Sequence, residues 1–556
     1  MPMNTLHLLL IAAAVLVAGY VIYGGILAKK WRIGSRQSTP ALFKQDNYDY
    51  VPSRHGEIFC HQFAANADRG LLVGTVQASI FGWLPMLLWM LLGSIFLGGV
   101  QDMAALFTSV RNQGRSLGRV MERNFGKWFK RIFLAFAWVC TVLAIAAFTD
   151  WVSQNYFGLS VSGSRAISSG RITSMTIFLT VMAFFLGLIV RHGNLSHVVN
   201  ELIAVLMVVA AVMLGYMYPI FLRVTNWRLY LFIYIALSAA LPVWMLLQPR
   251  DKMNTSLILF IMAAAVLGLI IARPAMKLEP FRGFTVDGQN LFPYLFVTAT
   301  SGAVSGYHAM VNSSVTSKMI RNEGRIRLAS FGTMMLSTFL GVVFLLVVGA
   351  KATGAEMSTI NPVAAFTGGV AENLSRLGVS KLEIIELSSF AICSLVITSL
   401  DSIARVGRTI WQEMLLDAGS KEEDRSKRLK VFSNRYFATV ITVLPAVGIA
   451  QLGYKKIWPL FGSVNLFLSA AALLACLVFF KKAKRKSFVL WMCTLVMVVL
   501  SAAASGTTCM NMLTNVLTGA SASVLADGVY FLFAAGELGL LVVLFARAMI
   551  CMLKKS

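Results

Sequence analysis

The stretch FVTATSGAVSGYHAMVNSS, residues 296–314, decides how the rest of the chain is interpreted. It has the length of a membrane helix, yet it is crowded with glycine, serine and threonine and carries one histidine. Its two glycines four residues apart allow close approach of helix backbones, and Ser301, Ser305 and His308 would share one helical face. This pattern predicts a helix that is buried among other helices and lines something polar.

The composition identifies the class of protein around this stretch. Of 556 residues, 57% are hydrophobic and only 13% are charged, which is typical of a polytopic membrane protein. About fifteen apolar segments have the length, or nearly the length, to cross a bilayer of ~30 Å. These segments are 6–27, 71–82, 84–110, 131–149, 173–190, 198–222, 229–247, 255–272, 293–310, 330–350, 384–400, 436–452, 457–480, 487–505 and 528–547.

The formal net charge of +25 reflects membrane topology rather than a nucleic-acid partner. About three quarters of the 49 lysine and arginine residues fall in alternate loops, beginning with the loop after the first span, so the N-terminus is predicted outside and the C-terminus in the cytoplasm. The basic loops would contact anionic lipid headgroups. Most cysteines lie in or beside spans, so no disulfide framework is expected. The oligomeric state is left open.

Two segments are predicted to be interrupted helices. The segment 71–82 contains Gly74 and Gly82, and its Thr75 and Gln77 would be tolerated at membrane depth beside a cavity or other protein. An ordinary short helix packed by small residues is the alternative. In the segment 229–247, Pro242 removes a backbone hydrogen bond.

The five-helix offset between these two segments places them in opposite orientations, as an inverted repeat requires. We therefore expect an all-α membrane fold with a 5+5 inverted-repeat core, in which residues 296–314 form a close-packed wall. The expected units are an N-terminal helix and cytoplasmic segment (1–70), the first repeat (71–222), the second repeat (229–410), a charged cytoplasmic linker (411–435) and C-terminal accessory helices (436–556).

Several ionisable residues within or beside spans have two interpretations. Asp102 is either a functional carboxylate or the partner of an arginine in the loop 111–131. Asp401 and Arg405 are spaced to pair across one helical turn, as a structural ion pair or a cytoplasmic gate. Glu537 is either a proton carrier or a neutral, hydrogen-bonded carboxyl group.

Enzyme and metal signatures are sparse. The sequence contains no P-loop and no HExxH motif, which argues against a primary pump with its own ATPase domain and against a zinc protease. His55, Cys60 and His61 have the residue types of metal ligands, but no second ligand pair accompanies them, so polar packing is the preferred interpretation. Neither a cofactor nor a metal is expected.

Seven stretches together resemble the carbon starvation protein A (CstA) family of bacterial inner-membrane transporters. They are YVPSRHGEIFCHQFAA (50–65), LLVGTVQASIFGWLPMLLW (71–89), GGVQDMAALFTSVRNQGRSLG (98–118), LLQPRDKMN (246–254), SGAVSGYHAMVNSSVTSK (301–318), TSLDSIARVGR (398–408) and IWPLFGSVN (457–465). The resemblance implies uptake of peptides, or in other members of pyruvate, coupled to protons, on a fold similar to the amino acid, polyamine and organocation (LeuT-like) transporters. This chain departs from the family at Gln62 and Gln101, where members typically have histidine.

The hypothesis is therefore a secondary transporter of the bacterial cytoplasmic membrane that imports short peptides, with protons as the preferred coupling ion. Pyruvate carried with protons or sodium is the alternative, and a membrane nutrient sensor without net transport is a further one. An integral-membrane enzyme is disfavoured because the histidines are scattered. The candidate residues for substrate binding or coupling are His61, Gln62, Gly74, Thr75, Gln77, Asp102, Pro242, Gln248, Thr300, Ser301, Ser305 and His308. The candidates for gates or ion pairs are Arg250, Asp251, Asp401 and Arg405.

Overall fold

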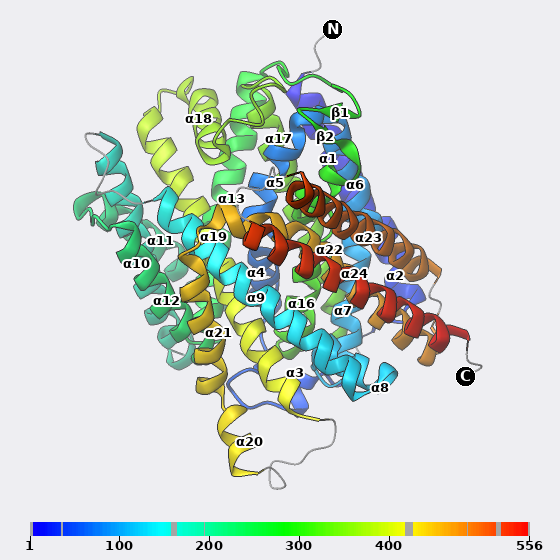
Figure 1. The fold of residues 1–556 in the computed structure, drawn as a ribbon. Coiled ribbons are helices and arrows are strands. Elements are labelled where there is room, and N and C mark those ends of the chain that lie inside the picture. The colour runs from blue at the N-terminus through cyan, green and yellow to red at the C-terminus, as the bar shows by residue number, and fades with distance from the viewer. Residues whose placement is uncertain are drawn as a thin grey trace.

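The computed structural model describes residues 4–34, 37–156, 164–193, 195–417, 426–485, 488–518 and 524–553, and it is helical almost throughout (Figure 1). The α-helices are α1 (Thr5–Ala18), α2 (Gly24–Lys30), α3 (Pro40–Phe43), α4 (His55–Asn66), α5 (Arg69–Ala78), α6 (Trp83–Gly93), α7 (Gly99–Arg111), α8 (Leu117–Phe125), α9 (Lys127–Asn155), α10 (Ser164–His192), α11 (His197–Met217), α12 (Val224–Ala240), α13 (Leu247–Ala272), α14 (Leu291–Thr298), α15 (Thr300–Ala303), α16 (Gly306–Ser314), α17 (Thr333–Gly349), α18 (Pro362–Ser375), α19 (Lys381–Leu415), α20 (Lys427–Phe432), α21 (Arg435–Ala450), α22 (Tyr454–Lys482), α23 (Phe488–Leu517) and α24 (Val524–Leu553). Strands β1 (Thr285–Val286) and β2 (Gln289–Asn290) form a small antiparallel hairpin.

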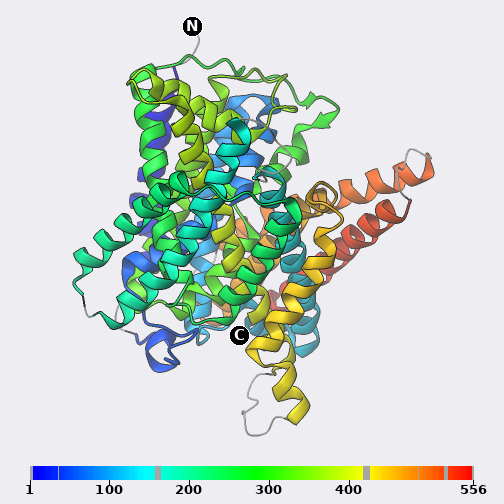
Figure 2. The same ribbon diagram turned by 90° about the vertical axis from the view of Figure 1, so that its left-hand side faces the viewer.

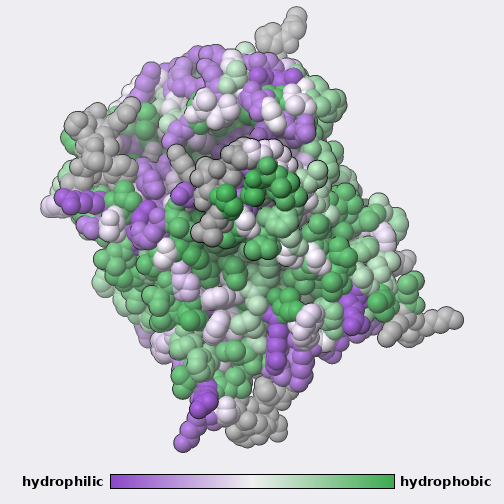
Figure 3. Space-filling model, in the orientation of Figure 1, coloured by the Kyte–Doolittle hydropathy of each residue, from purple (hydrophilic) through white to green (hydrophobic). Residues whose placement is uncertain are grey.

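The distribution of hydropathy fits a membrane protein. Among the described residues, eleven helical stretches are long and apolar enough to cross a membrane. Four of the fifteen expected segments are not among these eleven stretches, and each forms a shorter or interrupted helix. They are 71–82 (α5), 229–247 (α12), 293–310 (α14 to α16) and 436–452 (α21). Figure 3 shows a broad hydrophobic band between two hydrophilic ends of the molecule. We name these ends the upper face, where α1 begins beside Pro274, and the lower face, where α20 lies (Figure 1).

The first interrupted helix is longer than the sequence indicated. Helix α4 begins at His55, inside the segment 1–70 that was expected to be cytoplasmic after its first helix, and α5 continues from it to Ala78. The interruption lies at Ala67 and Asp68, whose backbone angles are not helical, and α5 runs through Gly74. The prediction of a break at Gly74 was therefore wrong. The polar residues of α4 are tolerated because neighbouring helices, not lipid, surround them.

The second interruption lies in residues 296–314 itself. Helix α14 ends at Thr298, and α15 ends at Ala303. The next two residues are extended: Val304 has φ of −160° and ψ of 132°, and Ser305 has φ of −139° and ψ of 127°. Helix α16 begins at Gly306. The prediction of one continuous helix with Ser301, Ser305 and His308 on one face was therefore wrong. The extended residues separate Ser301 on α15 from His308 on α16.

Pro242 does not interrupt a span. Helix α12 ends at Ala240, and α13 begins at Leu247 and is itself long enough to cross the membrane. The six residues between them form a connection at the lower face, where the backbone of Val243 donates to Tyr48. Proline here ends a helix instead of breaking it.

The interrupted helices pack together in the centre of the molecule. Helix α5 contacts α14 and α15, and α17 packs against both α4 and α5. Gly74 makes this possible, because a Cβ atom there would lie 2.2 Å from the backbone oxygen of Thr298. Helices α9 and α19 form an extensive contact beside this centre. The α10–α11 hairpin and the α23–α24 pair lie at the periphery (Figure 2).

Candidate transport site

The two interruptions meet through side chains. Asp68 caps α5, since its Oδ1 accepts from the backbone N–H of Leu71 at 3.1 Å. Its Oδ2 accepts from the hydroxyl of Ser301 on α15 at 3.2 Å. Gly70 permits this contact, because a Cβ atom at that position would lie 2.5 Å from the Ser301 hydroxyl. This hydrogen bond connects the interruption between α4 and α5 with the interrupted helix of α14 to α16.

The second interruption is held from α22 and α7. The side-chain oxygen of Asn465 accepts from the Ser305 hydroxyl and from the backbone N–H of Tyr307, each at 3.0 Å. Gln101 donates to the backbone oxygen of Ser305 at 2.6 Å and accepts from Ser469. Both α5 and α16 begin at the interruptions, so the positive ends of two helix dipoles face the centre of the molecule. Such an arrangement favours a negatively charged ligand group.

A cavity of about 320 Å³ adjoins the interruptions. It lies between α5, α14, α15 and α22. Its lining is Gly70, Gln77, Tyr294, Val297, Thr298, Thr300, Ser301, Trp458, Phe461, Gly462 and Asn465. Three candidates named from the sequence, Gln77, Thr300 and Ser301, therefore share one cavity. Its mixture of aromatic walls and a few polar groups is typical of small-molecule sites.

Beside this cavity lies a buried cation that the sequence analysis missed. Arg69 is the first residue of α5 and is 4% exposed. Its guanidinium carbon lies 3.7 Å from the ring centre of Trp458, 4.9 Å from that of Trp151 and 5.2 Å from that of Tyr454. The Nε and Nη1 atoms have no hydrogen-bond partner. Arg69 was overlooked because the span was taken to begin at Leu71.

A network of buried charges lies on the lower side of the interruptions. His61 Nδ1 lies 2.7 Å from Asp251 Oδ2, and both side chains are fully buried. Next to Asp251, Arg250 lies 3.8 Å from Asp401 and stacks over Tyr234, whose hydroxyl donates to Asp401. Arg250 and Asp251 lie in the buried first turn of α13. One helix thus presents a cation and an anion to α4, α12 and α19.

Asp102 belongs to a separate polar chain. Its Oδ2 accepts from Asn66 at 3.4 Å, Asn66 accepts from Gln62 at 2.7 Å, and Gln62 accepts from Thr316 at 2.6 Å. Among the described residues no arginine or lysine pairs with Asp102, so the alternative of an ion pair with the 111–131 loop is not observed. Two candidates, Gln62 and Asp102, are therefore linked through an asparagine.

The lower end of α19 contains a different ion pair from the predicted one. Arg405 and Arg408 lie 2.8 Å and 2.6 Å from Asp49, in the segment before α4. Arg405 also donates to the backbone oxygens of Ser238 and Leu241, which end α12. The predicted pair between Asp401 and Arg405 was wrong, because each residue has a partner from another part of the chain. The 411–435 linker falls partly outside the described residues.

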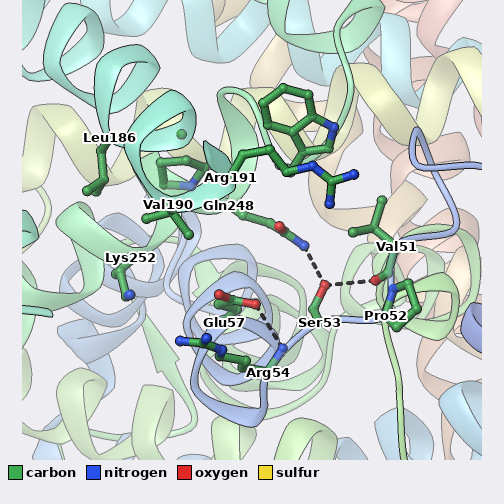
Figure 4. A pocket seen from close by; sticks show the side chains of 13 residues that line it. Val51, Pro52, Ser53, Arg54, Glu57, Leu186, Val190, Arg191, Gln248 and Lys252 are labelled. Carbon is green, nitrogen blue, oxygen red and sulfur yellow. Dashed lines mark hydrogen bonds between the residues drawn. The ribbon is translucent and has the colours of Figure 1, made fainter. Parts of the chain in front are cut away.

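Gln248 lines a second cavity, of about 200 Å³, near the lower face. Figure 4 shows its amide pointing to the hydroxyl of Ser53, to which it donates at 2.6 Å. Arg54, Glu57 and Lys252 contribute charged groups to the same cavity. The space lies below the His61 and Asp251 pair, between the beginnings of α4 and α13 and the end of α10.

The remaining candidates are dispersed. Thr75 donates to the backbone oxygen of Leu71 within its own helix. His308 is buried on α16, and neither of its ring nitrogens has a hydrogen-bond partner. Glu537 accepts from Ser505 at 2.8 Å and contacts Ser463 at 3.4 Å, which links α22, α23 and α24. Within the described residues, no group of three histidine, cysteine or acidic side chains is placed to hold a metal.

Comparison with known proteins identifies the family. The family model for carbon starvation protein CstA matches residues 4–373 and 349–505. The chain belongs to the CstA family. It is therefore a multi-pass membrane transporter and not an enzyme.

Two relatives from Escherichia coli K12 illustrate the range within this family. The protein named peptide transporter CstA is 28% identical over 565 residues, covering 87% of this chain and 78% of the relative. The protein named pyruvate/proton symporter BtsT is 29% identical over 401 residues, covering 69% of this chain but only 54% of the symporter. The chain thus spans about half the length of this second relative.

A solved structure shows the fold. A mutant form of the manganese transporter of Eremococcus coleocola superposes with a TM-score of 0.50 at 12% sequence identity, covering 93% of this chain and 99% of that one. The expected LeuT-like fold class is supported at this level. At such low identity the likeness concerns the fold alone.

Proposed function

We propose that this protein is a secondary active transporter that imports short peptides across the cytoplasmic membrane. The observation that carries the proposal is the junction of two interrupted helices, with helix N-termini, buried charges and a cavity of about 320 Å³ in one place. A cavity of this size lies in the range of small-molecule sites, and it suits a dipeptide better than a three-carbon acid, which would leave more of the space to water.

Proton coupling is assigned first to His61 and Asp251. Their side chains are in contact and fully buried, so a change in the charge of either one alters the energy of the network formed with Arg250 and Asp401. Asp102 and His308 are the further coupling candidates. The name of the symporter relative, which specifies protons, supports protons over sodium.

The inverted repeats are proposed to begin at the two interrupted helices, at 55 and 291, rather than at 71 and 229. An equivalent pair of contacts supports this division: α9 packs on α21 as α19 packs on α12. The α10–α11 hairpin is then an insertion in the first repeat. Transport would occur as α4 to α7 and α14 to α17 rock against the helices centred on α9 and α19.

The upper face is proposed to lie outside the cell and the lower face in the cytoplasm, because the lower loops carry most of the basic residues. Those residues would also contact anionic lipid headgroups. The localisation proposed from the family is the bacterial cytoplasmic membrane.

The proposal is tested with purified protein in proteoliposomes. Labelled di- and tripeptides and pyruvate are offered with an imposed pH gradient or an imposed sodium gradient. Accumulation of a peptide that follows the pH gradient supports the proposal. Accumulation of pyruvate alone favours the second candidate, for which the symporter relative is the supporting observation. Binding of either compound without uptake would support a sensor and overturn the transporter proposal.

A further inference from the structure

We infer that Arg69 binds the carboxylate of the transported substrate. The inference rests on the proposed function and deepens it, because it names the chemical group that the site recognises: a free carboxylate, as at the C-terminus of a peptide. The geometry that points to it is a buried arginine at the interruption of α4 and α5, surrounded by aromatic rings and left with unpartnered N–H groups.

The position of Arg69 connects it with the cavity. Gly70, the next residue, lines the cavity, and so does Trp458, whose ring also stacks on the guanidinium. The indole thus contacts both the cation and the cavity. The inference includes a rotation of the Trp458 side chain, which would open the guanidinium to a cavity-bound anion.

Arg69 has no carboxylate partner among the described residues, since none lies within 4.0 Å of its nitrogen atoms. Two carboxylates on neighbouring elements are engaged elsewhere. Asp68 accepts from Leu71 and Ser301. Asp150 lies 2.9 Å from Arg228 Nε and accepts from the backbone of Tyr454 at 2.7 Å. The Nε and Nη1 donors of Arg69 are therefore left without a protein acceptor.

Aromatic rings stabilise a cation without using its N–H groups. Trp151, Tyr454 and Trp458 contact the guanidinium through their faces, and such contacts hold the charge while leaving the planar edge of the group free. That edge matches a carboxylate, which arginine binds through two parallel hydrogen bonds. An unpartnered cation buried at membrane depth is costly, and an anionic substrate would relieve that cost.

The rings also belong to the part of the molecule that is proposed to stay fixed. Arg69 lies on α5, whereas Trp151 lies on α9 and the other two rings lie on α22. A carboxylate bound at Arg69 would therefore bridge the moving and fixed groups of helices. Substrate binding is thereby linked to the closure of the upper face.

The test compares a transported dipeptide with the same dipeptide carrying a C-terminal amide, in proteoliposomes containing wild-type, Arg69→Lys, Arg69→Gln or Arg171→Gln protein. Arg171 is the control: it is an arginine that is only partly buried and that pairs with Glu386, and neither residue lines the cavity. We expect the wild type to prefer the acid over the amide by about 10- to 100-fold, the range of one charge-assisted pair. Arg69→Gln should abolish this preference, Arg69→Lys should retain part of it, and Arg171→Gln should leave it unchanged.

Two results would overturn the inference: equal uptake of acid and amide by the wild type, or an unchanged preference in Arg69→Gln. If a variant does not insert or fold, competition by the amide against labelled dipeptide uptake in the wild type decides alone, with equal competition as the contradicting result. Wild-type protein that takes up neither peptides nor pyruvate would contradict the proposed function itself. The two failures are therefore distinguishable.

Discussion

Buried arginines at the centre of the molecule and near its lower face are held in opposite ways. At the central interruption of α4 and α5, Arg69 lies among aromatic rings and has free N–H groups. Near the lower face, Arg405 and Arg408 share the carboxylate of Asp49. The central cation therefore has no carboxylate within ion-pair distance, whereas the lower cations are paired with one. We infer that the lower contacts act as a latch formed by the protein alone, whereas the central cation is completed by a ligand.

The largest expected effect comes from breaking the lower latch. Asp49→Asn leaves Arg405 and Arg408 buried without their carboxylate, so we expect the free energy of unfolding to fall by about 3 kcal/mol. Thermal denaturation of the purified protein in detergent measures this change. Asp287→Asn, in the exposed β1–β2 connection, is the control and should leave the melting temperature unchanged. A shift in Asp49→Asn no larger than in this control would show that the latch is not a stabilising element.

The charge network of His61, Asp251, Arg250 and Asp401, on the lower side of the interruptions, should control coupling more than stability. Asp251→Asn removes the charge that contacts His61, so we expect the dependence of peptide uptake on the pH gradient to disappear and the initial rate to fall at least about tenfold. Uptake in proteoliposomes at several external pH values measures both effects. Glu386→Gln removes another buried carboxylate, one that pairs with Arg171, and should keep the pH dependence. If peptide uptake by Asp251→Asn still depends on the pH gradient, the assignment of coupling to Asp251 is wrong. Asp102 or His308 would then be the coupling residue.

Removing the central cation should affect stability less than breaking the lower latch. In Arg69→Gln the aromatic contacts are lost, but no carboxylate is left without a partner, so we expect the free energy of unfolding to change by no more than about 1 kcal/mol. The same denaturation assay applies, with Asp49→Asn measured in parallel. If Arg69→Gln lowers the free energy of unfolding more than Asp49→Asn does, Arg69 has a structural role. The contrast between Arg69 and the lower latch is then wrong.

The smallest expected effect concerns pH. Burial alone would raise the pKa of Asp49, but Arg408, Lys318 and Arg405 hold that pKa well below its ordinary value. A carboxylate with a lowered pKa stabilises the folded state above its ordinary pKa of ~3.9, and this stability is lost only as the pH falls below that value. The difference in melting temperature between wild type and Asp49→Asn should therefore stay constant from about pH 5 to pH 8. A difference that shrinks within this range would show that the latch opens on protonation.

Much of the fold follows from hydropathy. Each of the expected apolar segments corresponds to a helix or to part of an interrupted helix. Hydropathy detects such segments because a chain that crosses the bilayer must be helical and predominantly apolar. The interruptions were harder to place. The break at Asp68 lies in the segment that the sequence predicts to be cytoplasmic. The sequence instead favoured breaks at Gly74 and Pro242, because glycine and proline commonly interrupt helices. Gly74 instead permits close packing, and Pro242 ends a helix.

The partners of the buried charges could not be predicted from local spacing. Asp401 and Arg405 are one turn apart, yet each interacts with a residue more than a hundred positions away, at Arg250 and at Asp49. Such contacts depend on how the repeats pack, which residue spacing along one helix does not specify. Ser301 and Ser305 were correctly singled out for their polarity, but their partners, Asp68 and Asn465, lie on other helices.

The proposed substrate site lies where the two interrupted helices meet. Ser301→Cys places a thiol in the lining of the cavity, and its reaction with a membrane-impermeant thiol reagent is followed in intact vesicles, with the wild type correcting for the seven native cysteines. We expect Ser301→Cys to be labelled above the wild type and a transported dipeptide to slow this labelling several-fold. An equal labelling rate with and without a saturating transported substrate would contradict the proposed site.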